Sequence, residues 1–332
     1  MVRWMLRVGV AVALAVGPAA AQTGVPADRD WDPVARDFNR QAGDGGTSFG
    51  APRGAQGQVN SVPAVDRELA RPGLAPKDRA NLLMYRAMLN LAAGNRAQTD
   101  RDIAQALKAD PNLKYDLLAS RARDMAASGR TQPAIDLVEK ALKDQPGYVP
   151  LITTRGQVRM MQGDYALALA DFNQSAETDD IARRLRAQAH YTNGNYQAAV
   201  GDLDHLLQSG SKVSEPIYLV LWRYANNVKL RRDARNQLAA DMRSYGEPRT
   251  WPAPIARFLA GRITAGELEL VAESDDAAKR ANGRCLATYF IAMENVRQGN
   301  RTRARELLQL TQARCVAAHF ANWAATAELK RL

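Results

Sequence analysis

The sequence has few of the residues that most catalytic and metal sites require. Its 332 residues include two cysteines and three histidines, His190, His205 and His319. None of these histidines stands in a recognisable Ser/His/Asp or Cys/His arrangement, and the sequence contains neither H-E-x-x-H nor a glycine-rich phosphate loop. Two cysteines without nearby histidine ligands make a poor metal site. We therefore expect no catalytic residue, no metal and no cofactor.

The sequence also lacks a cluster of residues at metal-ligand spacing. Carboxylates such as Asp202 and Asp204 are scattered along expected helices, where we interpret them as solvated faces. A pair of acids of the kind that glycosidases use stays open on sequence alone.

Apolar runs of membrane-spanning length are absent. The run Val8–Val16 is about half of the roughly 20 residues that a span needs. Arg3 and Arg7 precede it, and Ala19–Ala21 follows. This order predicts a secretory signal peptide over residues 1–21, cleaved after Ala21, with an N-terminal membrane anchor as the alternative.

Export follows from this interpretation. Gln22 stands where a lipoprotein would need cysteine, so we expect a mature chain that is soluble beyond a membrane. The Ala-rich cleavage site in an Ala- and Arg-rich chain indicates a bacterial periplasm.

Aromatic residues make up only 6 % of the chain, and Val and Ile rarely alternate with polar residues. Ala, Leu, Arg and Gln recur instead, which favours helices over strands. The formal net charge is +10. A basic surface suits nucleic acid, acidic wall polymers or anionic lipid, but Lys and Arg are dispersed and export argues against nucleic acid.

The segment 22–76 is rich in Gly and Pro and is predicted to be a disordered arm. Trp31, Val34 and Phe38 are the exception, because they share one face of a short helix. They form either a docking peptide or a chance cluster in a linker.

Internal repeats carry the fold prediction. A Gly-polar-x turn recurs at Gly94, Gly129, Gly163 and Gly194, with spacings of 35, 34 and 31 residues, and again at Gly299. Each glycine is expected to end one helix and to let a second helix run back against it.

These turns, with small residues at the expected helix crossings, resemble the tetratricopeptide-repeat (TPR) family. The third repeat matches the pattern most fully, with Gly156, Gly163, Tyr165, Ala168 and Phe172. The resemblance implies an all-α, TPR-type α-solenoid of antiparallel helix pairs, regular over residues 77–210.

The remaining part, residues 211–332, resembles the NlpI family of periplasmic TPR adaptors more narrowly. The matching positions are Leu221, Trp222, Tyr224, Ala225, Trp251, Phe258, Leu259 and Gly261. The resemblance implies degenerate helical repeats closed by a terminal TPR, and an adaptor that docks peptidoglycan hydrolases and a protease without chemistry of its own. Proteins of that family are dimeric, so it admits a homodimer, although no residue marks a dimer face.

Trp222 and Trp251 have two interpretations. They anchor a partner, or they fill irregular packing between degenerate repeats. Their apolar surroundings favour packing.

TPR arrays bind ligands on a concave face lined by the first helix of each repeat. The resemblance implies that eight residues of this chain line such a groove. They are Asn81, Tyr85, Arg123, Thr154, Gln157, Arg184, Gln188 and Tyr191. Arg123 and Arg184 suit a carboxylate, and the tyrosines offer flat contacts.

Cys285 and Cys315 are the only cysteines, an even number in a chain predicted to be exported. With Gly299 at the turn, Cys285 falls at the first residue of one helix and Cys315 at the end of its antiparallel partner. We therefore expect a disulfide, with stabilisation of roughly 3–4 kcal/mol in the chain-entropy model.

These features predict a periplasmic TPR scaffold that binds proteins of the cell envelope and is not an enzyme. The alternative is an accessory protein that binds polysaccharide or wall polymer during export.

Overall fold

The computed structural model describes residues 61–332 except 212, 247–249 and 317–318. This part of the chain forms sixteen α-helices and no strand, which confirms the predicted all-α class. None of its helices is both long and apolar enough to cross a membrane. The predicted signal peptide and the cluster of Trp31, Val34 and Phe38 lie outside the described residues.

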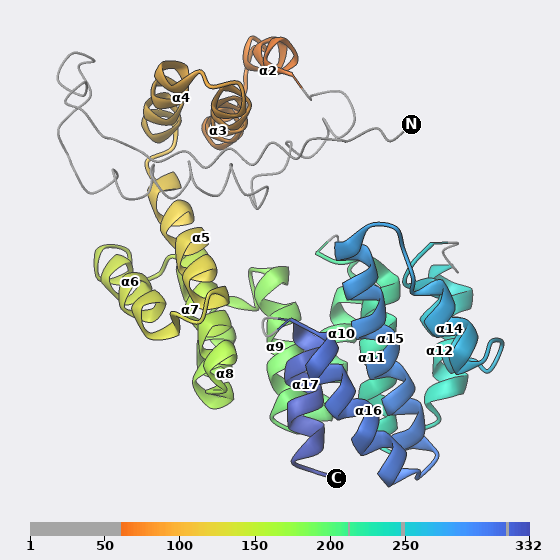
Figure 1. Cartoon of the computed structure of the whole chain (residues 1–332). Helices are drawn as coiled ribbons and strands as arrows, with labels where there is room; N and C mark the ends of the chain where they lie inside the picture. The colour runs from red at the N-terminus through yellow and green to blue at the C-terminus, as the bar shows by residue number, and fades with distance from the viewer. Residues whose placement is uncertain (1–60, 212, 247–249, 317–318) are drawn as a thin grey trace, which may run out of the picture. The chain divides into compact units, whose positions relative to one another are not determined.

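The chain divides into two compact units between Pro111 and Asn112. This division falls inside the stretch 77–210 that we predicted as regular repeats. The described helices of the first unit are α2 (Val62–Leu69), α3 (Pro76–Ala92) and α4 (Arg96–Ala109), shown in Figure 1.

Helix α2 corrects one expectation, because it lies in the segment 22–76 that was predicted to be disordered. It begins with Pro63 in its first turn, and Val65 is fully buried against Leu82 of α3. Asp66 of α2 accepts a hydrogen bond from Arg86 of α3 at 2.5 Å. Eight residues are too few for a helix that is stable alone. Helix α2 therefore depends on its contacts with α3, which its own sequence does not reveal.

The second unit contains six antiparallel helix pairs and a final single helix among its described residues. The pairs are α5 (Leu113–Ala127) with α6 (Thr131–Asp144), α7 (Val149–Gln162) with α8 (Tyr165–Ser175), α9 (Asp180–Thr192) with α10 (Tyr196–Gln208), α11 (Pro216–Lys229) with α12 (Ala234–Tyr245), α13 (Ala253–Leu259) with α14 (Ala265–Val271), and α15 (Ala277–Arg297) with α16 (Arg301–Arg314). Helix α17 (Phe320–Leu329) ends the array.

The glycine turns have one shared geometry, which explains their recurrence. Gly94, Gly129, Gly163, Gly194 and Gly299 all have φ between 77° and 88°. The residue after each glycine donates its backbone N–H to the carbonyl oxygen five positions earlier, at 2.7–2.9 Å. A left-handed residue with this bond closes the helix in a Schellman motif, where glycine is least strained. The predicted hairpin turns are confirmed.

The α11–α12 hairpin keeps this turn without glycine. Arg231 occupies the left-handed position with φ 55°, and Arg232 donates to the carbonyl oxygen of Asn227 at 3.0 Å. A search for Gly-polar-x turns therefore misses this pair.

Ion pairs join the two helices of four hairpins. In each, an arginine of the first helix binds an aspartate of the second that is at most 6 % exposed. The pairs are Arg86–Asp102, Arg155–Asp171, Arg186–Asp202 and Arg223–Asp241, with separations of 16, 16, 16 and 18 residues. Most of these contacts are bidentate, the geometry that a guanidinium and a carboxylate favour.

The pair of Arg186 and Asp202 corrects the interpretation of Asp202 as solvated. Asp202 is 6 % exposed and accepts from Arg186 at 2.7 and 2.9 Å. Asp204 binds Arg223 of the next hairpin at 2.5 Å, but its side chain is 36 % exposed and is therefore still partly solvated. Buried carboxylates need such partners, because desolvation would otherwise neutralise them.

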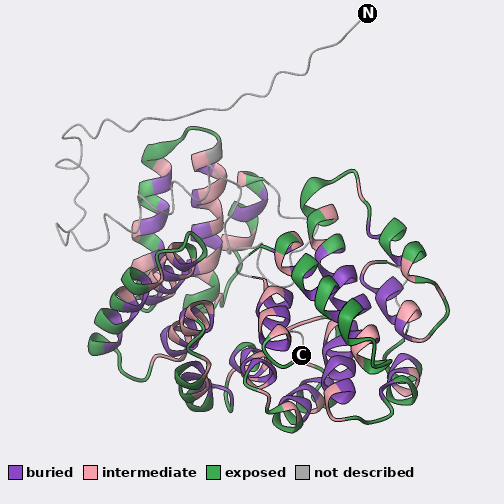
Figure 2. Ribbon diagram, turned by 60° about the horizontal axis from the view of Figure 1, so that its bottom comes forward, coloured by how far each residue is buried: buried purple, intermediate pink, exposed green. Residues whose placement is uncertain are grey.

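The end of the second unit packs back on its middle. Helix α17 contacts α9, α15 and α16, and α15 contacts α11. Glu328 of α17 is fully buried and accepts from Lys229 at 2.5 Å and from Tyr196 at 3.2 Å. Figure 2 shows buried residues along the faces that these helices turn toward one another. One continuous apolar core therefore joins helices α7 to α17 of this unit.

Candidate functional site

Four of the eight predicted groove residues meet at one cavity in the second unit. Gln157 comes from α7, and Arg184, Gln188 and Tyr191 come from α9. The cavity has a volume of about 320 Å³, at the lower end of the range for ligand sites.

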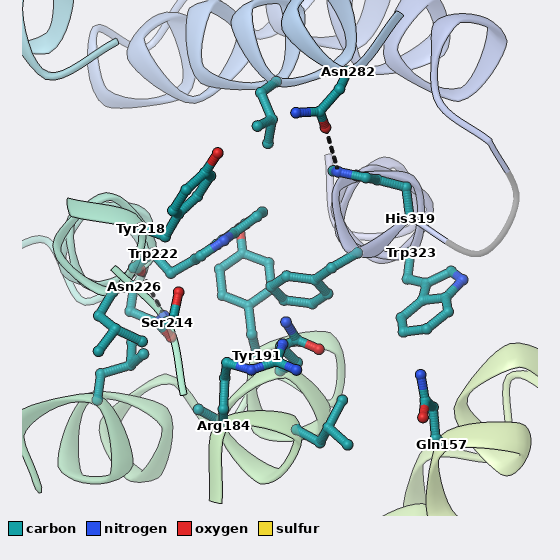
Figure 3. Close-up of a pocket in the computed structure, with 17 residues that line it drawn as sticks. Gln157, Arg184, Tyr191, Ser214, Tyr218, Trp222, Asn226, Asn282, His319 and Trp323 are labelled. Carbon is teal, nitrogen blue, oxygen red and sulfur yellow. Dashed lines mark hydrogen bonds between the residues drawn. The ribbon is translucent and has the colours of Figure 1, made fainter. Parts of the chain in front are cut away.

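The other walls come from elements that the groove prediction omitted. Helix α11 contributes Tyr218, Trp222 and Asn226, and the end of the chain contributes Asn282 of α15 and Trp323 of α17. Figure 3 shows α9 on one side of the cavity, α15 opposite it, and α11 and α17 on the two flanks. These segments are far apart in sequence, and no periodic signal connects them.

The cavity floor is aromatic and almost closed to solvent. Trp222 lies 4.2 Å from Phe320 and 5.0 Å from Tyr289, measured between ring centroids. Trp222 is 9 % exposed, so the structure supports the packing interpretation of this tryptophan. The rings join α11, α15 and α17 into a rigid base.

Tyr191 belongs to this base. It is 1 % exposed and accepts a hydrogen bond from the Tyr289 hydroxyl at 2.7 Å, while its own hydroxyl points to the sulfur of Met293 at 3.6 Å. Burial raises the pKa of Tyr191 well above its ordinary value. Its hydroxyl is already engaged in the core, so Tyr191 shapes the floor instead of offering an open face.

Arg184 is the cation at the cavity. It has no hydrogen-bond or ion-pair partner among the described residues, and its Nε is buried. Burial lowers the pKa of Arg184, while the charge of Asp179 opposes this effect. Because arginine keeps its proton in proteins, this guanidinium stays charged, partly desolvated and unpaired. It differs in this respect from the arginines bound to buried aspartates.

Asn226 presents a second unmet group. Its side-chain nitrogen donates to the carbonyl oxygen of Trp222 at 2.8 Å, but its Oδ1 is buried without a partner among the described residues. The residue is 1 % exposed. A buried acceptor without a donor is costly, so this oxygen is an unsatisfied polar atom in the wall of the cavity.

His319 is fixed at the rim by hydrogen bonds. Its Nδ1 accepts from the backbone N–H of Ala321 at 3.1 Å and thereby caps α17. Nε2 therefore carries the proton and donates to Oδ1 of Asn282 at 3.1 Å. Burial lowers the pKa of His319, which favours this neutral form.

The predicted disulfide between Cys285 and Cys315 is present, with the two Cα atoms 4.9 Å apart. Its place in the helices differs from the prediction. Helix α15 begins at Ala277, so Cys285 lies in its third turn, and Cys315 is the C-cap of α16. The bridge nevertheless joins the two helices of the terminal pair.

The expectation that no histidine lies near the cysteines is wrong. Nδ1 of His319 is 3.3 Å from Sγ of Cys285, and the three side chains form a compact group. Both sulfurs are bonded to each other and Nδ1 accepts the N–H of Ala321. The donor atoms are thus committed to structural bonds and do not fit a metal in this state.

The other four predicted groove residues lie elsewhere. Arg123 of α5 donates to Oγ1 of Thr154 of α7 at 2.8 Å, and Thr154 is 1 % exposed. These two residues therefore bind each other across neighbouring pairs. Asn81 and Tyr85 lie on α3 in the first unit, where Tyr85 packs beside Val65.

Comparisons with known proteins leave the family of the chain open. A scan against models of protein families and a search of curated proteins found no match. Among solved structures, the chain is similar to a tetratricopeptide repeat protein from Parabacteroides merdae ATCC 43184 at 17 % identity. That match has a TM-score of 0.43 and covers 74 % of this chain and 98 % of the other.

Proposed function

We propose that this chain is an exported scaffold that holds other proteins through the cavity of its second unit and has no catalytic activity. The unpaired Arg184 beside an apolar floor carries the proposal. A protein segment can place a side chain on the floor and its backbone against the amide groups of Gln157 and Gln188. An apolar centre with a polar rim is the usual anatomy of such contacts.

Export is supported by two independent features. Residues 1–21 have the order of a secretory signal peptide cleaved after Ala21. Disulfides such as Cys285–Cys315 persist in oxidising compartments and are rare in the cytosol. We propose the bacterial periplasm as the compartment.

The resemblance to the NlpI family supports cell-envelope partners. On that basis the proposed partners are peptidoglycan hydrolases or a processing protease, and the proposed assembly is a homodimer. Analytical ultracentrifugation of the mature chain would test the dimer separately from partner binding.

The test of the scaffold is affinity capture with mature protein. Wild-type chain, Arg184→Glu and the control Arg305→Glu would each be incubated with envelope extract. Arg305 is an exposed residue of α16 outside the cavity. We expect wild type and the control to retain the same hydrolase or protease and Arg184→Glu to lose it. Equal capture by all three proteins would contradict the proposal.

Binding of a wall polymer is the second candidate, favoured by the net charge of +10. Electrostatic binding of this kind weakens steeply with salt because charges are screened. Retention of glycan alone, lost at moderate salt and equal in both variants, would favour this alternative over the scaffold.

A further inference from the structure

We infer that Cys285, Cys315 and His319 bind one Zn²⁺ ion when the disulfide between the two cysteines is reduced. The chain with its disulfide and the chain with its metal are then two states of the same three side chains. This inference does not rest on the proposed scaffold function, because it needs no partner protein.

The three ligand atoms already lie close together. Nδ1 of His319 is 3.3 Å from Sγ of Cys285, and this nitrogen and the two sulfurs all lie within 4.8 Å of one another. Zinc with sulfur at about 2.3 Å and nitrogen at about 2.0 Å in a tetrahedron holds its ligand atoms roughly 3.5 Å apart. His319 follows Cys315 closely in the chain, but Cys285 comes 30 residues before Cys315, so only the fold assembles the set.

Asn282 orients His319 for this role. Nε2 of His319 donates to Oδ1 of Asn282 at 3.1 Å, as the dashed line in Figure 3 shows. A histidine that binds a metal is commonly held by such a bond from its other ring nitrogen, which leaves the lone pair on Nδ1. Nδ1 now accepts the N–H of Ala321, so the metal would replace the bond that caps α17.

Burial favours a divalent ion over free thiolates. Cys285 is 2 % and Cys315 7 % exposed, and two buried thiolates without a counter-charge would be costly. A divalent ion with both thiolates and a neutral imidazole has no net charge. No other Cys, His, Asp or Glu belongs to the group among the described residues, so water would complete the tetrahedron.

The change between the two states is a thiol–disulfide exchange with a dithiol reductant. One thiolate of the reductant attacks a sulfur of the bridge and forms a mixed disulfide. Its second thiol then closes the reductant's own disulfide and releases Cys285 and Cys315 as thiols, so two electrons and two protons reach the cysteines. The ion displaces these two protons when it binds the thiolates.

The experiment titrates Co²⁺ into the mature chain after reduction with dithiothreitol and removal of the reductant in oxygen-free buffer. Cobalt bound by thiolates gives a charge-transfer band in the near ultraviolet, and tetrahedral coordination gives strong visible bands. We expect both at one Co²⁺ per chain, and their loss when Zn²⁺ is added. The chain with its disulfide intact should show neither.

Two variants test the nitrogen ligand. His319→Asn keeps a favourable N-cap for α17 but removes Nδ1, whereas Asn282→Ala acts on the metal only through His319. We expect Asn282→Ala to weaken Co²⁺ binding about tenfold and His319→Asn at least about 100-fold, since loss of an outer partner alone costs about 10–100-fold. His205→Asn is the matched control, because His205 is exposed on α10 and outside the group.

Circular dichroism of each reduced protein shows whether its helices remain before metal is added. Loss of the helices of wild type on reduction, no bands in the reduced chain, or one Co²⁺ per two chains would overturn the inference. Equal affinity of wild type and His319→Asn would do the same, and Asn282→Ala decides the case if His319→Asn does not fold. Bands in the oxidised chain would require a different site. Capture of envelope proteins by the oxidised chain tests the scaffold separately.

Discussion

Gly156 of α7 lies directly against the side chain of Phe172 of α8. A Cβ atom added there would lie 2.6 Å from Cε1 of Phe172, whose side chain is fully buried. The ring cannot withdraw without disturbing the core, because interiors are close-packed. Glycine is therefore required here by space and not by backbone conformation.

Gly156→Ala is expected to lower the free energy of unfolding by about 1–3 kcal/mol, the usual cost of overpacking. Gly201→Ala is the matched control, because a Cβ at that helical position meets nothing within 4 Å. It should raise stability by about 0.5–1 kcal/mol through helix propensity. Urea denaturation followed by circular dichroism measures both, and equal effects of the two changes would contradict the packing argument.

We expect His319 to make the free energy of unfolding depend on pH. Burial lowers its pKa in the folded state below the unfolded value of about 6.5, so the folded chain binds fewer protons. This contribution to stability is full above about pH 6.5 and falls as the pH drops below it. Protonation would also remove the Nδ1 acceptor that caps α17.

His319→Asn tests this dependence. Asn is a favourable N-cap and does not titrate, so the variant should lose less stability than wild type between pH 7 and pH 5. Urea denaturation at both pH values measures the difference. The same loss in both proteins would show that other groups control the acid response.

At the scale of elements, each buried aspartate holds its helix pair closed. Asp171 of α8 accepts from Arg155 at 2.7 Å and from Arg159 at 2.7 Å, both on α7, and is 1 % exposed. Removing it would leave two half-buried guanidinium groups without this carboxylate.

We expect Asp171→Ala to lower the free energy of unfolding by about 3–5 kcal/mol, because it would leave the charges of two arginines without their buried partner. Glu306→Ala is the control, since its pair with Arg303 is exposed at both ends and should contribute at most about 1 kcal/mol. Thermal and urea denaturation measure both variants. Similar losses would mean that the Asp171 cluster contributes no more than a surface pair.

The hairpins show why part of the fold could be predicted. A left-handed turn favours glycine, so turns such as those at Gly163 and Gly194 can be recognised in the sequence. The turn at Arg231 has the same hydrogen bond, but an arginine in the sequence does not indicate a left-handed turn. The Arg155–Asp171 and Arg186–Asp202 pairs do recur in register, as the glycines do, but charged residues on helices are too common to stand out.

The site was less predictable than the hairpins. The offsets of a repeat identify Gln157, Arg184 and Gln188 because each lies on a first helix. Nothing in those offsets indicates that Asn282 and Trp323 close the other side of the cavity, since this depends on where α15 and α17 pack. Tyr191 meets the pattern as well, yet the same packing buries it.

At the scale of the whole molecule, the second unit contains every residue that lines the cavity, from Gln157 to Trp323. Because residues 112–332 form one compact unit, we expect a fragment of these residues to fold alone. Its tryptophan emission should match the blue-shifted emission of buried indoles, as Trp222 is 9 % and Trp323 8 % exposed.

Fluorescence and circular dichroism of the fragment check this expectation. A shorter fragment, 112–315, lacks α17 and should shift its emission to the red, because Trp222 loses the cover of Phe320. An unfolded 112–332 fragment would show that the second unit requires the first.

The ion pairs within hairpins bear on how such an array tolerates a change in length. Each buried aspartate finds its arginines inside its own hairpin: Asp102 with Arg86, Asp171 with Arg155, and Asp241 with Arg223. Duplication or deletion of one hairpin would therefore carry the buried carboxylate and its counter-charge together. The number of such hairpins can therefore change without leaving a buried aspartate unpaired.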